Sequence, residues 1–514
     1  MGTLKLLLPD LSWLKLYSRD KLSHDFMASL IAAVLALPQG VALAAVAGLP
    51  PEYGLYGAVF PVIIAALWGS SHHALGGPNL AASLIIISIL PIFGNLGSEL
   101  YISLALVLAL VAGLFQVTVG LLKLGYLLDY ISPTVISGVI NAVGILMVTG
   151  ASFGVIGYVT PYEDVWQFKV WHLLHEVTLL DPLSTAIGLS TLVVGLLSRF
   201  YFRRFWLVFA MIFGSAITLM LRNTLGLEGS RVEFLGNVSI DWIAFTQPTM
   251  DTSDFYVLRN MLLGGISIAL VGMLQAGLTS RLIADKSGQH IDVNREVFSQ
   301  GLHNIAASFL HGIAGATSTN RSLSHYNSGA KTPVAGILSA VFLLFLLLMF
   351  ASYIAWLPMP VIAAAMVLVG INTIHPRDFN LRGRSGRESL VFYFTLCLAL
   401  FAGLVEAVLW GVAASAMMYM KSSASLRYTH HRKSSQNQVL HFSGNLYFGS
   451  LRELKRLFEE LRLSGVKFLE IDVSEVGVMD YAVRRALNLE LQQRQARGCT
   501  LAVIWPREET QRQG

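Results

Sequence analysis

Two stretches of small and polar residues have the composition of a binding site for a small anion. The first reads Leu75-Gly-Gly-Pro-Asn-Leu-Ala81 and the second Gly315-Ala-Thr-Ser-Thr-Asn-Arg-Ser322. Glycine, proline and capping residues of this kind end one backbone element and begin a helix. The first turn of a helix has unpaired N–H groups and a partial positive charge. Two such helix starts that face each other would attract an anionic substrate.

The elements that position these stretches must be membrane helices. Of the 514 residues, 54% are hydrophobic and only 13% are charged, and the mean hydropathy is +0.61. This composition predicts a polytopic membrane protein and argues against a nucleic-acid partner, despite a net charge of +5. The first apolar run begins near Phe26 and is interrupted by Pro38 and Gln39, which favours a retained span over a signal peptide. The two cysteines support neither a disulfide framework nor a metal site.

Apolar segments from Phe26 to Met418 predict about fourteen spans in two sets of seven. With the N-terminus inside, the loops between Ser152 and Pro182 and between Leu225 and Phe255 lie outside and are acidic. The expected inner connections are basic and contain Arg199, Arg203, Arg204, Arg281, Lys286, Arg295, Arg377, Arg382, Arg384 and Arg387. By the positive-inside rule, this asymmetry places both termini in the cytoplasm.

After Met420 the composition changes to that of a small soluble α/β domain. We expect a hairpin or strand pair over 439–448, a helix over 451–463, a strand over 467–473, a helix over 481–497 and a strand over 500–505. The predicted organisation is an N-terminal segment (1–24), a first transmembrane repeat (25–222), an extracytoplasmic loop (223–256), a second repeat (257–421), a basic linker (422–437) and the soluble domain (438–514).

The chain resembles the sulfate permease (SulP) family of anion transporters, related to prestin, pendrin and cyanobacterial bicarbonate carriers. The resemblance rests on Leu37-Pro-Gln-Gly-Val-Ala-Leu43, Ala47-Gly-Leu-Pro-Pro-Glu-Tyr-Gly-Leu-Tyr56, Gly69-Ser-Ser-His-His73, the stretch from Leu127 to Gly138, and Ser328-Gly-Ala-Lys-Thr-Pro-Val-Ala-Gly336. The soluble tail resembles a STAS domain. The resemblance implies seven-plus-seven inverted repeats with core and gate domains, a homodimer, and elevator-like movement of the core.

The resemblance also implies that the anion lies between the starts of half-helices three and ten. The matching positions here are mostly neutral donors with an apolar wall and one cation. They are Gln39, Leu43, Asn79, Leu80, Gln275, Ser318, Thr319, Asn320 and Arg321. Such a site releases its anion readily, because a fully paired buried charge would hold it too tightly. For Arg321 the alternative is a structural role in which it caps backbone carbonyls; for Gln39 and Asn79 it is hydrogen bonding between helices.

Gln275 departs from the carboxylate that many relatives carry at this position. A carboxylate could bind sodium together with Thr279 or carry a proton, whereas an amide cannot. We therefore expect an anion exchanger or an uncoupled carrier. The sequence does not choose among sulfate, chloride and bicarbonate, and an anion-binding sensor or voltage-responsive protein, a dicarboxylate carrier and a nucleobase carrier remain alternatives. No nucleophile–base motif, metal cluster or phosphate loop indicates an enzyme or a cofactor.

In STAS domains of bacterial switch proteins, a phosphorylatable serine follows an aspartate at the start of the second helix. Tyr481 stands at that position here, after Asp480, which excludes serine phosphorylation. The domain also looks shortened near Gly514, which favours a dimerising or trafficking role over nucleotide binding. The chain length and simple termini favour a bacterial inner-membrane protein.

Overall fold

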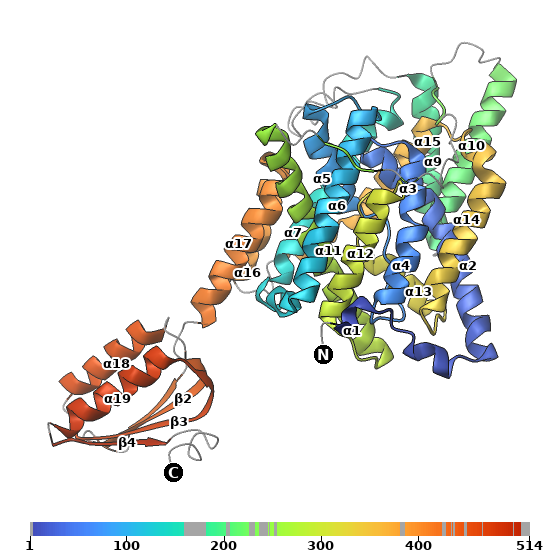
Figure 1. The fold of residues 1–514 in the computed structure, drawn as a ribbon. Helices are drawn as coiled ribbons and strands as arrows, with labels where there is room; N and C mark the ends of the chain where they lie inside the picture. The colour runs from blue at the N-terminus through green and yellow to red at the C-terminus, as the bar shows by residue number, and fades with distance from the viewer. Residues whose placement is uncertain are drawn as a thin grey trace. The chain divides into compact units, whose positions relative to one another are not determined.

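The computed structural model describes residues 4–158, 181–201, 206–225, 232–235, 245, 247–250, 254–380, 386–423, 428–432, 434, 437–446, 450–464, 466–496 and 498–504. The chain folds into two compact units, Met1–Ala413 and Ala414–Gly514. Helices form the first unit, whereas a sheet with two helices forms most of the second (Figure 1).

The helices of the first unit form a bundle (Figure 1). Their bounds are α1 (Leu4–Leu7), η1 (Ser12–Leu16), α2 (Arg19–Val46), α3 (Pro51–Gly57), α4 (Phe60–Trp68), α5 (Leu80–Ile89), η2 (Leu90–Ile92), α6 (Glu99–Leu121), η3 (Leu124–Tyr130), α7 (Pro133–Val155), α9 (Pro182–Tyr201), α10 (Trp206–Leu225), α11 (Phe255–Ser287), α12 (Val293–Phe309), α13 (Thr319–Asn327), α14 (Val334–Ile354), α15 (Met359–Thr373), η5 (Pro376–Phe379), α16 (Gly386–Phe401) and α17 (Leu404–Ser423).

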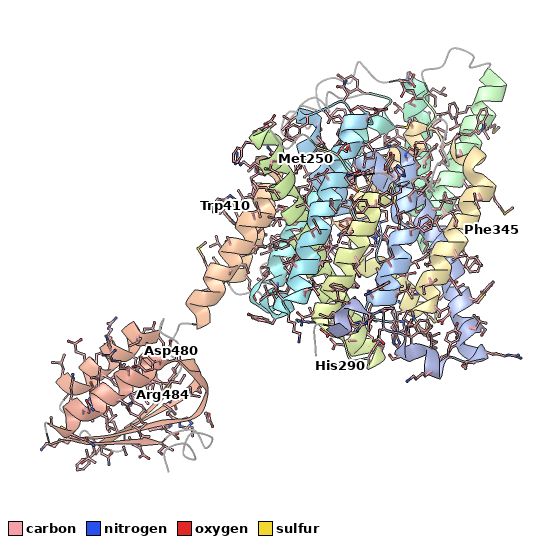
Figure 2. The ribbon with its side chains drawn as sticks, viewed as in Figure 1. Met250, His290, Phe345, Trp410, Asp480 and Arg484 are labelled. Atoms are coloured by element: carbon pink, nitrogen blue, oxygen red, sulfur yellow. The ribbon has the colours of Figure 1, made fainter. Side chains whose placement is uncertain are left out.

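Within the described residues, six helical segments are long and apolar enough to cross a membrane, and five shorter apolar helices accompany them. Figure 2 shows large side chains such as Phe345 and Trp410 on the outward faces of the bundle, where they are 58% and 61% exposed. Outward-facing apolar side chains are what a lipid environment requires. The expected count of about fourteen spans stays a prediction.

The helix boundaries follow from local capping chemistry. Ser98, Ser132, Asp254 and Asp292 each stand immediately before a helix and accept a hydrogen bond from a first-turn N–H group. Pro38 interrupts the first apolar run of the sequence but not the helix, because α2 continues through it from Arg19 to Val46. A proline costs one backbone hydrogen bond inside a helix, and a bundle can tolerate that loss.

Contacts among the helices repeat in corresponding pairs. The packing of α2 on α14 corresponds to that of α11 on α6, and the packing of α4 on α14 corresponds to that of α12 on α6. Likewise, the packing of α5 on α11 corresponds to that of α13 on α2. The packing of α7 on α16 corresponds to that of α15 on α9. The helices α2, α4, α5, α6, α7 and α9 thus have the counterparts α11, α12, α13, α14, α15 and α16, which is the relation that a two-repeat fold produces.

Two groups of helices follow from these contacts. The site group comprises α2–α6 and α11–α14, and the flanking group comprises α7, α9, α10, α15 and α16; packing is denser within each group than between them. Glycines allow the closest crossings. A Cβ at Gly301 would lie 2.8 Å from the Gly113 carbonyl oxygen, and a Cβ at Gly370 would lie 3.1 Å from that of Gly144. Small residues let membrane helices approach this closely.

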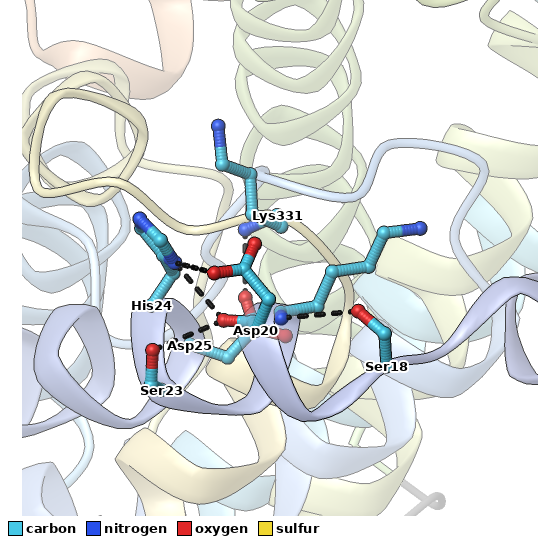
Figure 3. A network of polar contacts seen from close by, with 7 residues as sticks. Ser18, Asp20, Ser23, His24, Asp25 and Lys331 are labelled. Carbon is cyan, nitrogen blue, oxygen red and sulfur yellow. Dashed lines mark hydrogen bonds and ion pairs between the residues drawn. The ribbon is translucent and has the colours of Figure 1, made fainter.

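Asp25, which is fully buried, joins the start of α2 to the loop between α13 and α14 (Figure 3). Its carboxylate accepts hydrogen bonds from the N–H groups of Lys331 and Thr332 at 2.7 and 3.2 Å and from the Thr332 hydroxyl at 2.5 Å. Ser18 caps α2 by accepting from the Lys21 N–H group. A carboxylate that receives three donors can be buried without a cation, so this contact holds the end of α13 in place.

The second unit contains a four-stranded sheet in the order β1 (Tyr428–Arg432), β2 (Asn437–Leu446), β3 (Phe468–Met479) and β4 (Thr500–Ile504). The β1–β2 pair is antiparallel and the other two pairs are parallel, with α18 (Leu451–Leu463) and α19 (Tyr481–Gln495) as crossovers. Apolar residues of α18, α19 and the strands form one core. The sequence placed β1 in the linker, but its backbone pairs with β2, so the domain begins earlier than expected.

Candidate functional site

The two predicted stretches lie side by side as a short antiparallel pair of extended segments. Pro78 and Gly315 form a bridge, the Ala316 N–H group donates to the Gly77 carbonyl at 3.0 Å, and that of Ser318 donates to the Leu75 carbonyl at 3.1 Å. We call these residues, 75–79 and 315–318, the paired segments. Because they run in opposite directions, α5 and α13 leave them at opposite ends. Both helix N-termini therefore face the region around the pair.

Each helix start carries a side-chain cap. The Asn79 Oδ1 atom accepts from the Ala81 N–H group at 3.0 Å at the start of α5. The Ser318 Oγ atom accepts from the Arg321 N–H group at 3.5 Å at the start of α13. A helix has more first-turn donors than a single cap can satisfy. The remaining donors give each start the partial positive charge that attracts an anion.

Arg321 connects the two segments. It is the only charged residue in the two stretches, and its Nη2 atom donates to the Pro78 carbonyl at 3.1 Å. Gly77 has a φ of +131°, and a Cβ there would lie 2.8 Å from the Arg321 Nη1 atom. The glycine is required both for this backbone conformation and for the close approach of the guanidinium group. Arg321 thus combines a structural contact with a positive charge at the site.

Helix α11 contacts the first paired segment at Asn79 and the start of α13 at Thr319. The Asn79 Nδ2 atom donates to the Gln275 Oε1 atom at 2.8 Å, and the Thr279 and Thr319 hydroxyls lie 2.6 Å apart. Gln275 and Thr279 are four residues apart, and so they lie on one face of α11. One face of one helix thereby fixes the spacing of the two helix starts.

The remaining predicted residues form no hydrogen bond to the paired segments within the described part of the chain. Leu43 of α2 is buried in the main apolar cluster with Ala81, and Leu80 packs at the edge of that cluster. Gln39 is half-buried one turn before Leu43, and among the described residues no hydrogen bond reaches its amide. Asn320 lies in the first turn of α13, but its side chain is outside the described part of the structure.

Sequence reasoning missed the polar face of α12 that supports the second segment. The Asn304 Oδ1 atom accepts from the Gly315 N–H group at 2.8 Å, and the Gln300 Nε2 atom donates to the Gly315 carbonyl at 3.1 Å. His303 packs so closely that a Cβ at Gly315 would lie 2.5 Å from its Cε1 atom. The sequence did contain a signal for this face, because Gln300, His303 and Asn304 are polar residues at positions i, i+3 and i+4 of a membrane helix.

Glu296, one turn before Gln300, supports the approach to the first segment. Its Oε1 atom accepts from the N–H groups of Ser70 and Ser71, both at 2.6 Å, and its Oε2 atom accepts from the Ser280 hydroxyl at 3.2 Å. Glu296 is 3% exposed. Several donors make a buried carboxylate tolerable, so Glu296 anchors the loop before Leu75 rather than presenting its charge at the site.

Accessibility separates the supporting side chains of α12 from those at the start of α13. Gln300, His303 and Asn304 are at most 2% exposed, whereas Ser318 and Arg321 are half-buried and Thr319 is exposed. The accessible groups are amides, hydroxyls, helix-start N–H groups and one guanidinium, all of which can donate to an anion. Within the described residues no group of three or more metal-ligating side chains occurs.

Comparison with known proteins identifies the family of the chain. The model of the sulfate permease family matches residues 22–395, and that of the STAS domain matches residues 429–513. Low affinity sulfate transporter 3 from Stylosanthes hamata is 30% identical over 70% of this chain, which corresponds to 58% of that longer protein. Bicarbonate transporter BicA from a Picosynechococcus strain is 26% identical over 90% of this chain and 85% of its own length.

Among solved structures, the overall structure of SLC26A9 matches with a TM-score of 0.82 over 98% of this chain and 87% of that one. The sequence identity is 18%, so this match shows a shared fold. The named relatives are transporters, and the protein is a transporter rather than an enzyme. The matched family covers most of the membrane unit, so the chain belongs to the sulfate permease family, with a STAS domain at its C-terminal end.

Proposed function

We propose that this protein is a secondary transporter of small inorganic anions of the sulfate, chloride and bicarbonate class. The observation that carries the proposal is the antiparallel pairing of residues 75–79 and 315–318, which directs two helix N-termini and Arg321 toward one region. The donors there are neutral apart from Arg321. One cation with neutral donors binds an anion while still permitting its release.

We further propose that transport occurs by exchange or by uncoupled movement. The position at which a carboxylate would bind a cation is occupied by Gln275, and its Oε1 atom already accepts from Asn79. A neutral amide that is engaged in this way offers no charge for sodium. The rival, coupling to sodium at this position, requires the carboxylate that the chain lacks.

The movement that we propose is a displacement of the site group against the flanking group, in an elevator-type alternating-access cycle. The two groups have dense internal packing and fewer contacts between them, as two bodies that move past each other require. Both paired segments belong to the site group and would travel with it. A homodimer in a bacterial inner membrane, with both termini in the cytoplasm, completes the proposal.

The test is chloride counterflow into proteoliposomes, challenged with external sulfate, bicarbonate, oxalate, fumarate and uracil. Saturable exchange that inorganic anions inhibit and uracil does not would support the proposal. Inhibition by uracil, or more strongly by fumarate than by any inorganic anion, would favour a carrier for nucleobases or dicarboxylates. If vesicles that contain folded protein show no counterflow, exchange is wrong, and saturable binding without uptake would indicate a sensor.

Sodium dependence is tested separately. Uptake by the wild-type protein should be the same with and without a sodium gradient, and Gln275→Glu should introduce a dependence on cations. Gln275→Leu is the matched control, because it removes the same bond to Asn79 without adding a charge. Sodium-driven uptake by the wild-type protein would refute the assignment of Gln275.

A further inference from the structure

The N-terminal segment, Leu4–Leu16, has two different faces. Leu6 and Trp13 are buried, at 5% and 8% exposure, against the helical unit. The outer face contains Leu7, Leu8, Leu11 and Leu14, which are between 45% and 64% exposed. Four exposed leucines within eight positions are more apolar surface than a water-facing segment usually carries.

Hydrogen bonds fix this segment at one end of the site group. The Trp68 Nε1 atom donates to the Leu7 carbonyl at 3.1 Å, and the Asp10 N–H group donates to the Leu67 carbonyl at 3.0 Å. Arg295 donates to the carbonyls of Trp68 and Leu8 at 3.0 and 2.9 Å. The segment is thereby bound to the last turn of α4 and the first turn of α12.

These attachments place the segment at the level of a membrane surface. Pro51–Trp68 is one of the candidate membrane spans, so its last residue marks where the chain leaves the apolar layer. Figure 1 shows the segment at the foot of the bundle, beside the starts of α12 and α2, and His290 lies at the same end in Figure 2. The exposed leucines continue into Phe26, Met27 and Leu30 of α2, which are also exposed.

The charges near this segment favour an anionic surface. Residues 4–21 contain four basic and two acidic residues. Burial raises the pKa of the Asp10 carboxyl, but the hydrogen bonds from Ser12 and the charge of Arg295 outweigh this effect and lower it. The lowered pKa favours the ionised form of Asp10, whose carboxylate accepts from the Ser12 N–H group, while Lys15 and Arg19 are exposed. Exposed cations beside leucines are typical of segments that lie in the membrane interface.

We propose that Leu4–Leu16 is a lipid-binding surface that lies in the headgroup region of one leaflet, with its leucines toward the acyl chains and its cations at anionic phospholipid phosphates. The exposed apolar residues of the segment and of the nearby part of α2, together with the exposed cations Lys15 and Arg19, favour lipid over a protein partner. Because the segment is bound to α4 and α12, its attachment to lipid links the site group to one leaflet.

The test uses the full chain with Cys397→Ala and Cys499→Ala, so that a single introduced cysteine can carry an environment-sensitive fluorophore. Leu11→Cys and Leu14→Cys place the probe on the outer face, and Glu459→Cys, on an exposed position of α18, is the matched control. The proteins are reconstituted in phosphatidylcholine with and without phosphatidylglycerol. Quenchers are lipids labelled close to the headgroup, and aqueous iodide.

The proposal expects lipid quenching and protection from iodide at both leucine positions, with the opposite behaviour at Glu459. Quenching should weaken when phosphatidylglycerol is omitted, and unchanged quenching would overturn the role of anionic lipid. Iodide quenching equal to that of the control would show that the face lies in water. Protection from iodide without lipid quenching would show that protein covers it; either result overturns the proposal.

Discussion

The two paired segments share a backbone arrangement but differ in their side chains. The first leads from buried Asn79 into the apolar helix α5, which contains no charged residue. The second leads from half-buried Ser318 into the short, polar helix α13, which carries Arg321. The two helix starts therefore lead into helices of opposite character.

This difference shows how a repeated fold produces an asymmetric site. Pairing of the backbones and one bond each to α11 are common to both segments. The charge comes from α13 alone, but it reaches the first segment through the Pro78 carbonyl. In the site that we propose, the first segment provides a neutral wall with its helix-start donors, and the second adds the charge of Arg321.

The largest effect is expected from Gly315→Ala, which attacks the shared backbone pairing. A Cβ would lie 2.4 Å from the Gly77 carbonyl oxygen and 2.5 Å from the His303 ring, and both of these residues are buried. We expect transport to be lost and stability to fall by about 1–3 kcal/mol, as overpacking usually costs. Gly150→Ala is the control, because nothing lies within 4 Å of its Cβ position. Counterflow and thermal unfolding of the two variants are the measurements, and equal behaviour would refute the pairing.

The next effect is expected from Arg321→Ala, which removes the charge that distinguishes the second segment. Loss of a charge-assisted donor should weaken anion binding about 10- to 100-fold. Arg321→Lys keeps the positive charge but not the guanidinium group that donates to the Pro78 carbonyl, so its anion affinity should fall less than that of the alanine variant. Titration of anion binding by calorimetry checks this order. Wild-type affinity in the alanine variant would remove Arg321 from the site, and equal losses in both variants would make its role structural.

The smallest losses of anion affinity are expected from single changes at the two helix starts, Asn79→Ala and Thr319→Val. Asn79→Ala removes a cap and a bond to Gln275, and so it should weaken binding about fivefold. Thr319→Val removes one bond made by an exposed hydroxyl, and so it should weaken binding about twofold. The same titration compares the two variants. A larger loss for Thr319→Val would reverse the assignment of the first segment as the neutral wall.

Much of the fold could be predicted because its signals are local. Hydropathy marks the membrane helices, and Asn79 and Ser318 mark the helix starts, since a cap acts on its own first turn. The extent of β1 could not be predicted, because a polar strand such as Tyr428–Arg432 exists only through pairing with β2. The continuity of α2 through Pro38 likewise depends on the helices around it.

The site was predicted only where residues flank the breaks. Asn79 bonds to Gln275, and Thr319 bonds to Thr279, so two residues that flank the breaks each have a partner on α11 that was not evident from the sequence. Gln300 and Asn304 escaped notice because they lie outside the two stretches and act by holding the backbone of Gly315. Support of this kind depends on tertiary pairing, which a single sequence does not reveal.

The central claim is that both helix starts contribute to one anion site. Its most direct test is the anomalous scattering of bromide in crystals of the protein grown with bromide in place of chloride. The account predicts a peak within hydrogen-bond distance of the first-turn N–H groups of both α5 and α13, close to Arg321. Bromide bound at only one of these helices, or elsewhere in the site group with this region empty, would contradict it.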